Sequence, residues 1–136
     1  MRGLKFAVPA LAAMLVLPAC QEEEEARSLE PPALVGADTE RGKLALRLHG
    51  CTTCHVAPGV VGGNQRIGPT LVGFTSRRYV AGSLPNTPEN AIHWIVSPQA
   101  ITPDSAMPDM GVDYETARDI VAYLRSQTET EWGSGS

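Results

Sequence analysis

The sequence predicts a small all-α domain, with three to five helices wrapped around a bulky group that the chain does not supply itself. Several segments carry helix start signals or apolar residues at helical spacing, and no segment alternates apolar and polar residues as a strand does. Only 5 % of the 136 residues are aromatic, whereas the chain has 13 glycines and 11 prolines. So few large side chains make a self-sufficient core difficult to build.

The first residues are typical of an export signal rather than of a folded domain. Residues 1–19 combine Arg2 and Lys5 with a short apolar stretch, which is too short to span a membrane as a helix. The stretch ends in "LPAC", residues 17–20, which resembles the lipobox of bacterial lipoproteins. We therefore expect Cys20 to be lipidated and to anchor the exported protein on the periplasmic or extracellular side of a bacterial membrane. A plain signal peptide followed by a stray cysteine is the alternative.

Residues 20–36 are predicted to form a disordered acidic tether. The stretch "QEEEEARSLEPP" has many charges and few apolar residues, a composition that cannot form a core. The domain that follows, residues 37–128, has nearly balanced charge. No dense basic patch occurs, which excludes nucleic acid as a partner. Residues 129–136 end in "GSGS" and are predicted to be a flexible tail.

The first helix of the domain is expected to run from the cap residue Asp38 to about Leu48, with Leu44 and Leu48 on one face. Gly42 lies inside it, where glycine is unfavourable by about 1 kcal/mol relative to alanine. A glycine at such a position usually permits a close helix crossing. Residues 56–70, rich in Gly and Pro, are predicted to be a loop, and a short helical piece is expected near Ser76.

Two further helices are predicted in the C-terminal half. Thr87 followed by Pro88 is a strong helix start, and this helix should end near Ser97 because Pro98 follows. Residues 98–112 are predicted to be irregular. Asp113 is expected to cap the last helix, in which the apolar residues keep i, i+3, i+4, i+7 spacing, namely Ala117, Ile120, Val121 and Leu124.

The motif "CTTCH", residues 51–55, concentrates soft ligands and is compatible with three chemistries. Cys51, Cys54 and His55 could bind zinc, act as a redox dithiol, or attach a haem covalently. Zinc needs a fourth ligand, for which only His49 or His93 remains. A dithiol site usually follows a strand, and none is predicted. In the third case the two thiols, one helical turn apart, form thioether bonds to one porphyrin edge and His55 binds the iron. A covalent haem would also fill the missing core.

The second axial ligand decides whether such an iron is open to small molecules. Met107 and Met110 lie in the loop "SPQAITPDSAMPDMGV", residues 97–112, and His93 is a third candidate. We favour Met107, because Pro103 and Pro108 restrict the loop around it. Met110 precedes Gly111 near the cap of the last helix, where a packing role is expected.

Taken in order, the motifs "GKLALRLHGCTTCH", "IGPTLVGF", "LPNTPENAIHWIVSPQAITPDSAMP" and "GVDYETARDIVAYL" resemble the class I (monohaem) cytochromes c, here in a bacterial lipoprotein form. The resemblance implies one covalent haem c with His55 and Met107 as axial ligands. It also implies that the Pro69 carbonyl accepts a hydrogen bond from His55 and that Leu71 packs on the haem. The resemblance further implies that Arg77 binds a haem propionate and that Trp94 lies near the methionine ligand. It also implies that Gly42 and Tyr123 lie where the first and last helices cross.

The function implied by this resemblance is electron transfer rather than catalysis. We expect a membrane-tethered, monomeric carrier that passes single electrons along a respiratory chain to a haem–copper terminal oxidase, with a quinol-oxidising complex as a possible donor. One alternative is a fixed cytochrome subunit of a larger complex. Another is a haem enzyme or gas sensor in which the methionine is displaced. The mature chain has one lysine, Lys43, so docking through a strongly positive patch is not expected.

Overall fold

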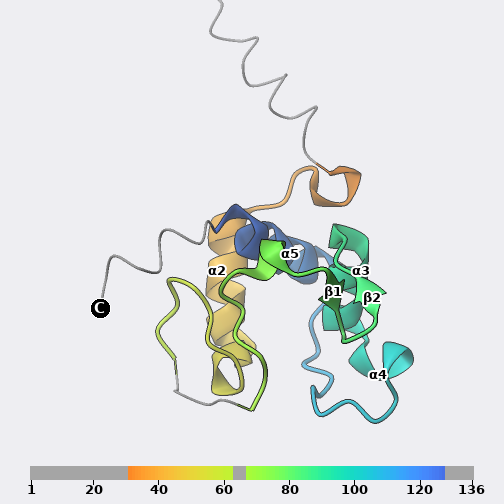
Figure 1. Cartoon of the computed structure of the whole chain (residues 1–136). Coiled ribbons are helices and arrows are strands. Elements are labelled where there is room, and N and C mark those ends of the chain that lie inside the picture. The colour runs from red at the N-terminus through yellow and green to blue at the C-terminus, as the bar shows by residue number, and fades with distance from the viewer. Residues whose placement is uncertain (1–30, 63–66, 128–136) are drawn as a thin grey trace, which may run out of the picture.

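Helices form most of the regular structure in residues 31–62 and 67–127, the parts of the chain that the computed structural model describes. They are α2 (Thr39–Leu48), α3 (Pro88–Val96), α4 (Pro98–Ile101) and α5 (Tyr114–Ser126). A single two-stranded antiparallel sheet pairs β1 (Tyr79–Val80) with β2 (Leu84–Pro85) in these residues. The prediction of a small all-α fold with three to five helices is confirmed (Figure 1).

Three helices begin at the predicted cap residues. The carboxylate of Asp38 accepts a hydrogen bond from the backbone N–H of Arg41 at 2.9 Å, and Asp113 accepts one from Thr116 at 2.7 Å. The Thr87 hydroxyl accepts one from the backbone N–H of Asn90 at 3.2 Å. Each bond satisfies a backbone donor that the first turn of a helix leaves unpaired.

The central contact of the fold is the crossing of α2 and α5, which Figure 1 shows at the heart of the domain. At Gly42 the two backbones approach so closely that a Cβ atom would lie 2.9 Å from the Ile120 nitrogen and closer still to the Asp119 carbonyl. No side chain fits there, so the prediction that Gly42 marks a close helix crossing is confirmed. The side chain of Asp119, 6 % exposed, also accepts hydrogen bonds from the Arg41 guanidinium and from the Asp38 backbone N–H.

The buried face of α2 carries Gly42, Ala45 and Leu46. Leu44 and Leu48, which share a face as predicted, point outward and are 51 % and 74 % exposed. In α5 the apolar spacing does mark the buried face, and its residues form the centre of the core together with Leu46, Ile92 and Phe74.

The tether ends earlier than the sequence predicted. Residues 31–36 were expected to be disordered, but Pro32–Leu34 forms a 3-10 helix, η2. Leu34 is 4 % exposed in the core cluster, and the Gly36 carbonyl accepts a hydrogen bond from Arg118 of α5 at 3.3 Å. The apolar side chain of Leu34 outweighs the local composition, so the folded domain includes these residues. The predicted signal peptide, Cys20 and tether residues 20–30 lie outside the described residues, as does the predicted tail at 129–136.

Two further segments differ from prediction. Residues 98–112 were expected to be irregular, but Pro98 stands in the first turn of the one-turn helix α4, where its missing N–H is harmless. The β1–β2 hairpin was not predicted. The short helical piece expected near Ser76 is the 3-10 helix η4, Phe74–Ser76. In residues 31–62 and 67–127 no helix has the length and apolar character needed to cross a membrane.

Candidate cofactor site

A cavity of about 630 Å³ opens between the helical crossing and the loops, within the size range of ligand and cofactor sites. Its floor is made by the buried faces of α2 and α5, with Leu46, Ile120 and Leu124. One wall contains the "CTTCH" motif, and the opposite wall contains the loop after α4. Most of the lining side chains are apolar, so the cavity suits a large hydrophobic group.

The end of α2 delivers the motif to this cavity. Gly50 adopts a left-handed conformation with φ +68°, after which the 3-10 helix η3, Cys51–Thr53, begins. The backbone N–H of His55 donates to the Cys51 carbonyl at 3.0 Å, which closes the turn. As a result Cys51, Cys54 and His55 all line the cavity, while Thr52 between them is buried.

The thiol environment does not favour the other two chemistries. Burial raises the pKa of the Cys51 thiol, with a smaller contribution from neighbouring Cys54, whereas reactive C-x-x-C dithiols need a lowered thiol pKa. In residues 31–62 and 67–127, no three His, Cys, Asp or Glu side chains are grouped so that they could hold a metal ion. These residues therefore offer no closed zinc site of the kind that structural zinc requires.

His55 is oriented by the loop that follows the motif. Its Nδ1–H donates to the Pro69 carbonyl at 2.7 Å, which leaves Nε2 free for a metal. The Gly68 N–H donates to the Cys54 carbonyl at 2.9 Å and brings this loop against the motif. Gly68 packs so tightly on the imidazole that a Cβ atom would lie 2.9 Å from Nε2 and nearer to Cε1.

Leu71 and Arg77 complete this wall. Leu71 lines the cavity, and its N–H donates to the Val56 carbonyl at 2.7 Å. The Arg77 guanidinium also lines the cavity and donates to the carbonyls of Thr70 and Val72. Arg77 thus connects the residues after Pro69 to the start of the β1–β2 hairpin, where its charge lies at the edge of the cavity.

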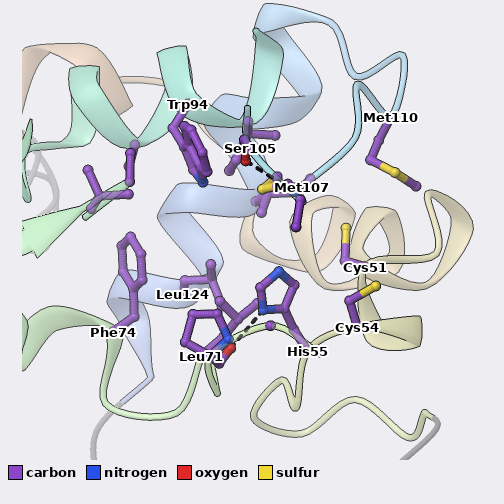
Figure 2. A pocket seen from close by; sticks show the side chains of 18 of the residues that line it. Cys51, Cys54, His55, Leu71, Phe74, Trp94, Ser105, Met107, Met110 and Leu124 are labelled. Carbon is purple, nitrogen blue, oxygen red and sulfur yellow. Dashed lines mark hydrogen bonds between the residues drawn. The ribbon is translucent and has the colours of Figure 1, made fainter. Parts of the chain in front are cut away.

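Met107 lies on the wall opposite His55, as Figure 2 shows. Two hydrogen bonds hold its backbone: the Met107 N–H donates to the Ser105 hydroxyl at 3.1 Å, and the Gln99 side-chain amide donates to the Met107 carbonyl at 2.8 Å. Trp94 of α3 also lines the cavity, and its ring lies close to Met107 in the same view.

The other candidate ligands are placed differently. Met110 lines the cavity but lies to one side, above Cys51 in Figure 2, and it packs against the core cluster. Its carbonyl lies 3.4 Å from His49 Nδ1. His93 is exposed on α3 and is not among the residues that line the cavity.

These residues fit a covalently bound haem. Cys51 and Cys54 stand side by side and would hold a haem through two thioether bonds, and His55 and Met107, which face the interior from opposite walls, would bind its iron (Figure 2). The close packing of Gly68 on the imidazole holds the histidine ring in one orientation. A haem bound there would supply the one-electron chemistry of its iron.

Several lining residues were not foreseen from the sequence. The hairpin contributes Tyr79, Val80, Ala81 and Gly82, and Ala81 has φ +55°. Its strands of two residues are too short to give an alternating pattern. Ser105 and Gln99, which position Met107, could have been suspected only from their nearness to Met107 in the sequence.

Comparisons with known proteins agree with this chemistry. A family model described as "Cytochrome c" matches residues 39–128. The curated protein "Cytochrome c oxidase subunit 2" of Alkalihalophilus pseudofirmus is 32 % identical over 87 residues, which cover 63 % of this chain and 25 % of that protein. The match therefore spans about a quarter of the length of this relative. No solved structure matches the chain significantly.

Proposed function

Because the chain belongs to the cytochrome c family, we propose that it is a monohaem electron carrier rather than an enzyme. The observation that carries this proposal is that His55 and Met107 line one cavity from opposite walls. Two protein ligands fill both axial positions of an iron, which leaves no open site for a substrate and favours electron transfer.

We propose that the electron acceptor is a haem–copper terminal oxidase. Support comes from the relative named "Cytochrome c oxidase subunit 2", although the match spans only a quarter of its length. In the respiratory chain the electron donor would be a quinol-oxidising complex. We propose that the carrier is a monomer. We propose no nucleic-acid partner, because the sequence contains no dense basic patch of the kind that binds nucleic acid.

We further propose that a lipid on Cys20 holds the domain at the outer face of a bacterial membrane. The lipobox-like "LPAC" and the acidic segment support this. Since residues 31–36 pack on the domain, the tether would comprise residues 20–30. A flexible chain of that length spans about 17–20 Å. Intact mass should reveal acyl chains on Cys20, and an unmodified N-terminus at another residue would refute the anchor.

Two other functions use the same cavity. In a haem enzyme or gas sensor, Met107 would be displaced by the small molecule. In a fixed subunit of a respiratory complex, the ligands stay in place but the protein does not leave its partner, so the protein would co-purify with large membrane subunits.

Carbon monoxide separates the carrier from the enzyme or sensor. The reduced protein should keep its spectrum when carbon monoxide is added, because both axial positions are occupied. It should also reduce a terminal oxidase in membranes of the source organism. A rapid carbon monoxide spectrum together with no oxidase turnover would contradict the proposed function.

A further inference from the structure

Arg77 is the one guanidinium, ammonium or carboxylate side chain among the described residues that line the cavity. Arg77 is half-buried and its guanidinium is engaged by the carbonyls of Thr70 and Val72. Apart from Arg77 and His55, the described lining contains no Asp, Glu, Lys, Arg or His side chain. The exposed members of the lining are Thr53, Ile67, Pro69, Tyr79, Gly82, Ala106 and Pro108. A partner that approaches this mouth therefore meets apolar and small polar side chains.

The loop beside the two cysteines adds exposed apolar surface to this mouth. Ile67 is 69 % exposed and also lines the cavity, and Val61 is 95 % exposed. Gly62, the neighbour of Val61, lies against the side chain of Thr52 within the motif. The aliphatic side chain of Ile67, exposed at the cavity itself, indicates an interaction surface there, and Val61 adds exposed apolar area in the same loop.

Three other basic side chains of the described domain are engaged away from the cavity. Arg41 is bound to Asp38 and Asp119, and Arg118 is bound to Glu115. The ammonium group of Lys43 lies 5.9 Å from the centre of the Tyr123 ring, on the side of the crossing. None of these three lines the cavity, and neither do Arg47, Arg78 and Arg125, so the described lining contains no ring of positive charge.

We propose that the redox partner docks on this mouth through an uncharged, apolar face, and that burial of Ile67 and Val61 rather than charge attraction holds the complex. This inference rests on the proposed function and defines the chemistry of the partner's surface. Without steering charges, association is slower than for oppositely charged partners and nearly independent of salt. An acidic partner surface would gain nothing from the described residues of this mouth.

The test measures kcat/KM for reduction of the terminal oxidase in membranes of the source organism at ionic strengths of about 20 and about 200 mM. The wild-type value should change by less than about twofold. Ile67→Asp and Val61→Asp should each lower it by about tenfold, because each loses an apolar contact and buries a carboxylate. Leu44→Asp, the matched control on the exposed face of α2, should leave it unchanged. Haem content and reduction potential confirm that each variant is intact.

Arg66 precedes Ile67 in the sequence but lies outside the described residues, so Arg66→Gln is a necessary further variant. A large loss of rate in Arg66→Gln, or a steep fall of the wild-type rate with salt, would overturn the proposal in favour of an acidic partner. An equal loss in Leu44→Asp would place the docking surface elsewhere.

Electron self-exchange between oxidised and reduced protein, measured by NMR line broadening, keeps the test independent of the oxidase. Two uncharged mouths should exchange electrons with little dependence on salt, and Ile67→Asp should slow the exchange. If oxidase turnover is absent but self-exchange behaves in this way, the proposed acceptor is wrong and the apolar surface stands. A strongly salt-dependent self-exchange that Ile67→Asp leaves unchanged would refute the surface itself.

Discussion

The crossing of α2 and α5 and the walls of the cavity are built on different principles. At the crossing, backbone meets backbone at Gly42, and buried side chains of α5 fill the interface. The walls around His55 and Met107 are loops whose positions depend on a few hydrogen bonds, such as those from His55 to Pro69 and from Gln99 to Met107. The helix crossing is thus packed entirely with residues of the chain, whereas the loops of the walls surround a large apolar cavity.

This difference assigns separate tasks to the two regions. The crossing supplies stability that the small core could not provide otherwise, and it fixes the end of α2 from which the motif emerges. The loops supply ligands, and their order depends on what fills the space between them, since a cavity lined by apolar groups forfeits contacts until it is filled. Changes at the crossing should therefore affect the free energy of unfolding, and changes in the walls should affect the iron.

Gly42→Ala should cause the largest loss. Alanine gains about 1 kcal/mol in helix propensity, but its Cβ would overlap the Asp119 carbonyl, and two backbones cannot relax as a side chain can. We expect the free energy of unfolding to fall by about 3 kcal/mol or more, measured by guanidinium titration of the haem protein. Leu44→Ala, on the exposed face of the same helix, should change it little. A comparable free energy of unfolding in the two variants would contradict the close approach of the two backbones at Gly42.

Gly68→Ala should have its main effect at the iron. The new Cβ would press on the His55 ring and weaken its hydrogen bond to Pro69, a bond that raises the basicity of a ligating imidazole. We expect a raised reduction potential in a titration of the haem protein, with a smaller loss of unfolding free energy than in Gly42→Ala. A wild-type potential in Gly68→Ala would contradict the role of this contact.

Tyr123→Phe tests a direct hydrogen bond between the two regions. The buried Tyr123 hydroxyl of α5 donates to the Pro58 carbonyl at 2.7 Å, and phenylalanine would remove this hydrogen bond. The expected loss is about 1–2 kcal/mol in chemical denaturation, while the reduction potential stays near the wild-type value. A large shift of potential would mean that the loop after the motif depends on α5 more than we infer.

Acid should weaken the helical region gradually. A backbone N–H at the start of each helix, from Arg41 and Thr116 respectively, holds the carboxyl pKa of Asp38 and of Asp113 below its usual value. The stability from these carboxylates is complete above the unfolded pKa of about 3.9 and is lost as pH falls through the lower folded pKa.

Asp38→Asn and Asp113→Asn provide the control for this pH dependence, because asparagine caps a helix without titrating. Both variants should match the wild type near neutral pH and should lose less stability between about pH 4 and pH 2. Thermal unfolding midpoints across this range measure the effect. An unchanged acid profile in the double variant would show that other carboxylates dominate.

The sequence predicted the parts of the fold that follow from local rules. The cap residues Asp38, Thr87 and Asp113 mark the starts of their helices in the sequence. Gly42 is informative because glycine is unfavourable inside a helix and usually occurs there where close packing requires it. Leu34 could not be foreseen, because one apolar residue in an acidic stretch has no local pattern, and its burial depends on α3 and α5. The exposure of Leu44 and Leu48 likewise depends on which face of α2 meets α5.

For the site, the sequence predicted candidate residues that the structure brings to one cavity, but it did not predict how they are held. The spacing of "CTTCH" identifies Cys51, Cys54 and His55, because a single turn brings them to one wall. The supports of Met107 at Gln99 and Ser105 arise from loop conformation, which no sequence periodicity encodes. The hairpin that closes the cavity at Ala81 and Gly82 has too few strand residues to be recognised.

We infer that Met107, and not Met110, binds the iron opposite His55. The most direct measurement compares the absorption spectra of oxidised Met107→Ala and Met110→Ala. Met107→Ala should lose the weak long-wavelength band of a sulfur-to-iron bond, and when reduced it should bind carbon monoxide. Met110→Ala should retain the band and stay closed to carbon monoxide. Loss of the band in Met110→Ala alone, or its survival in both variants, would contradict the claim.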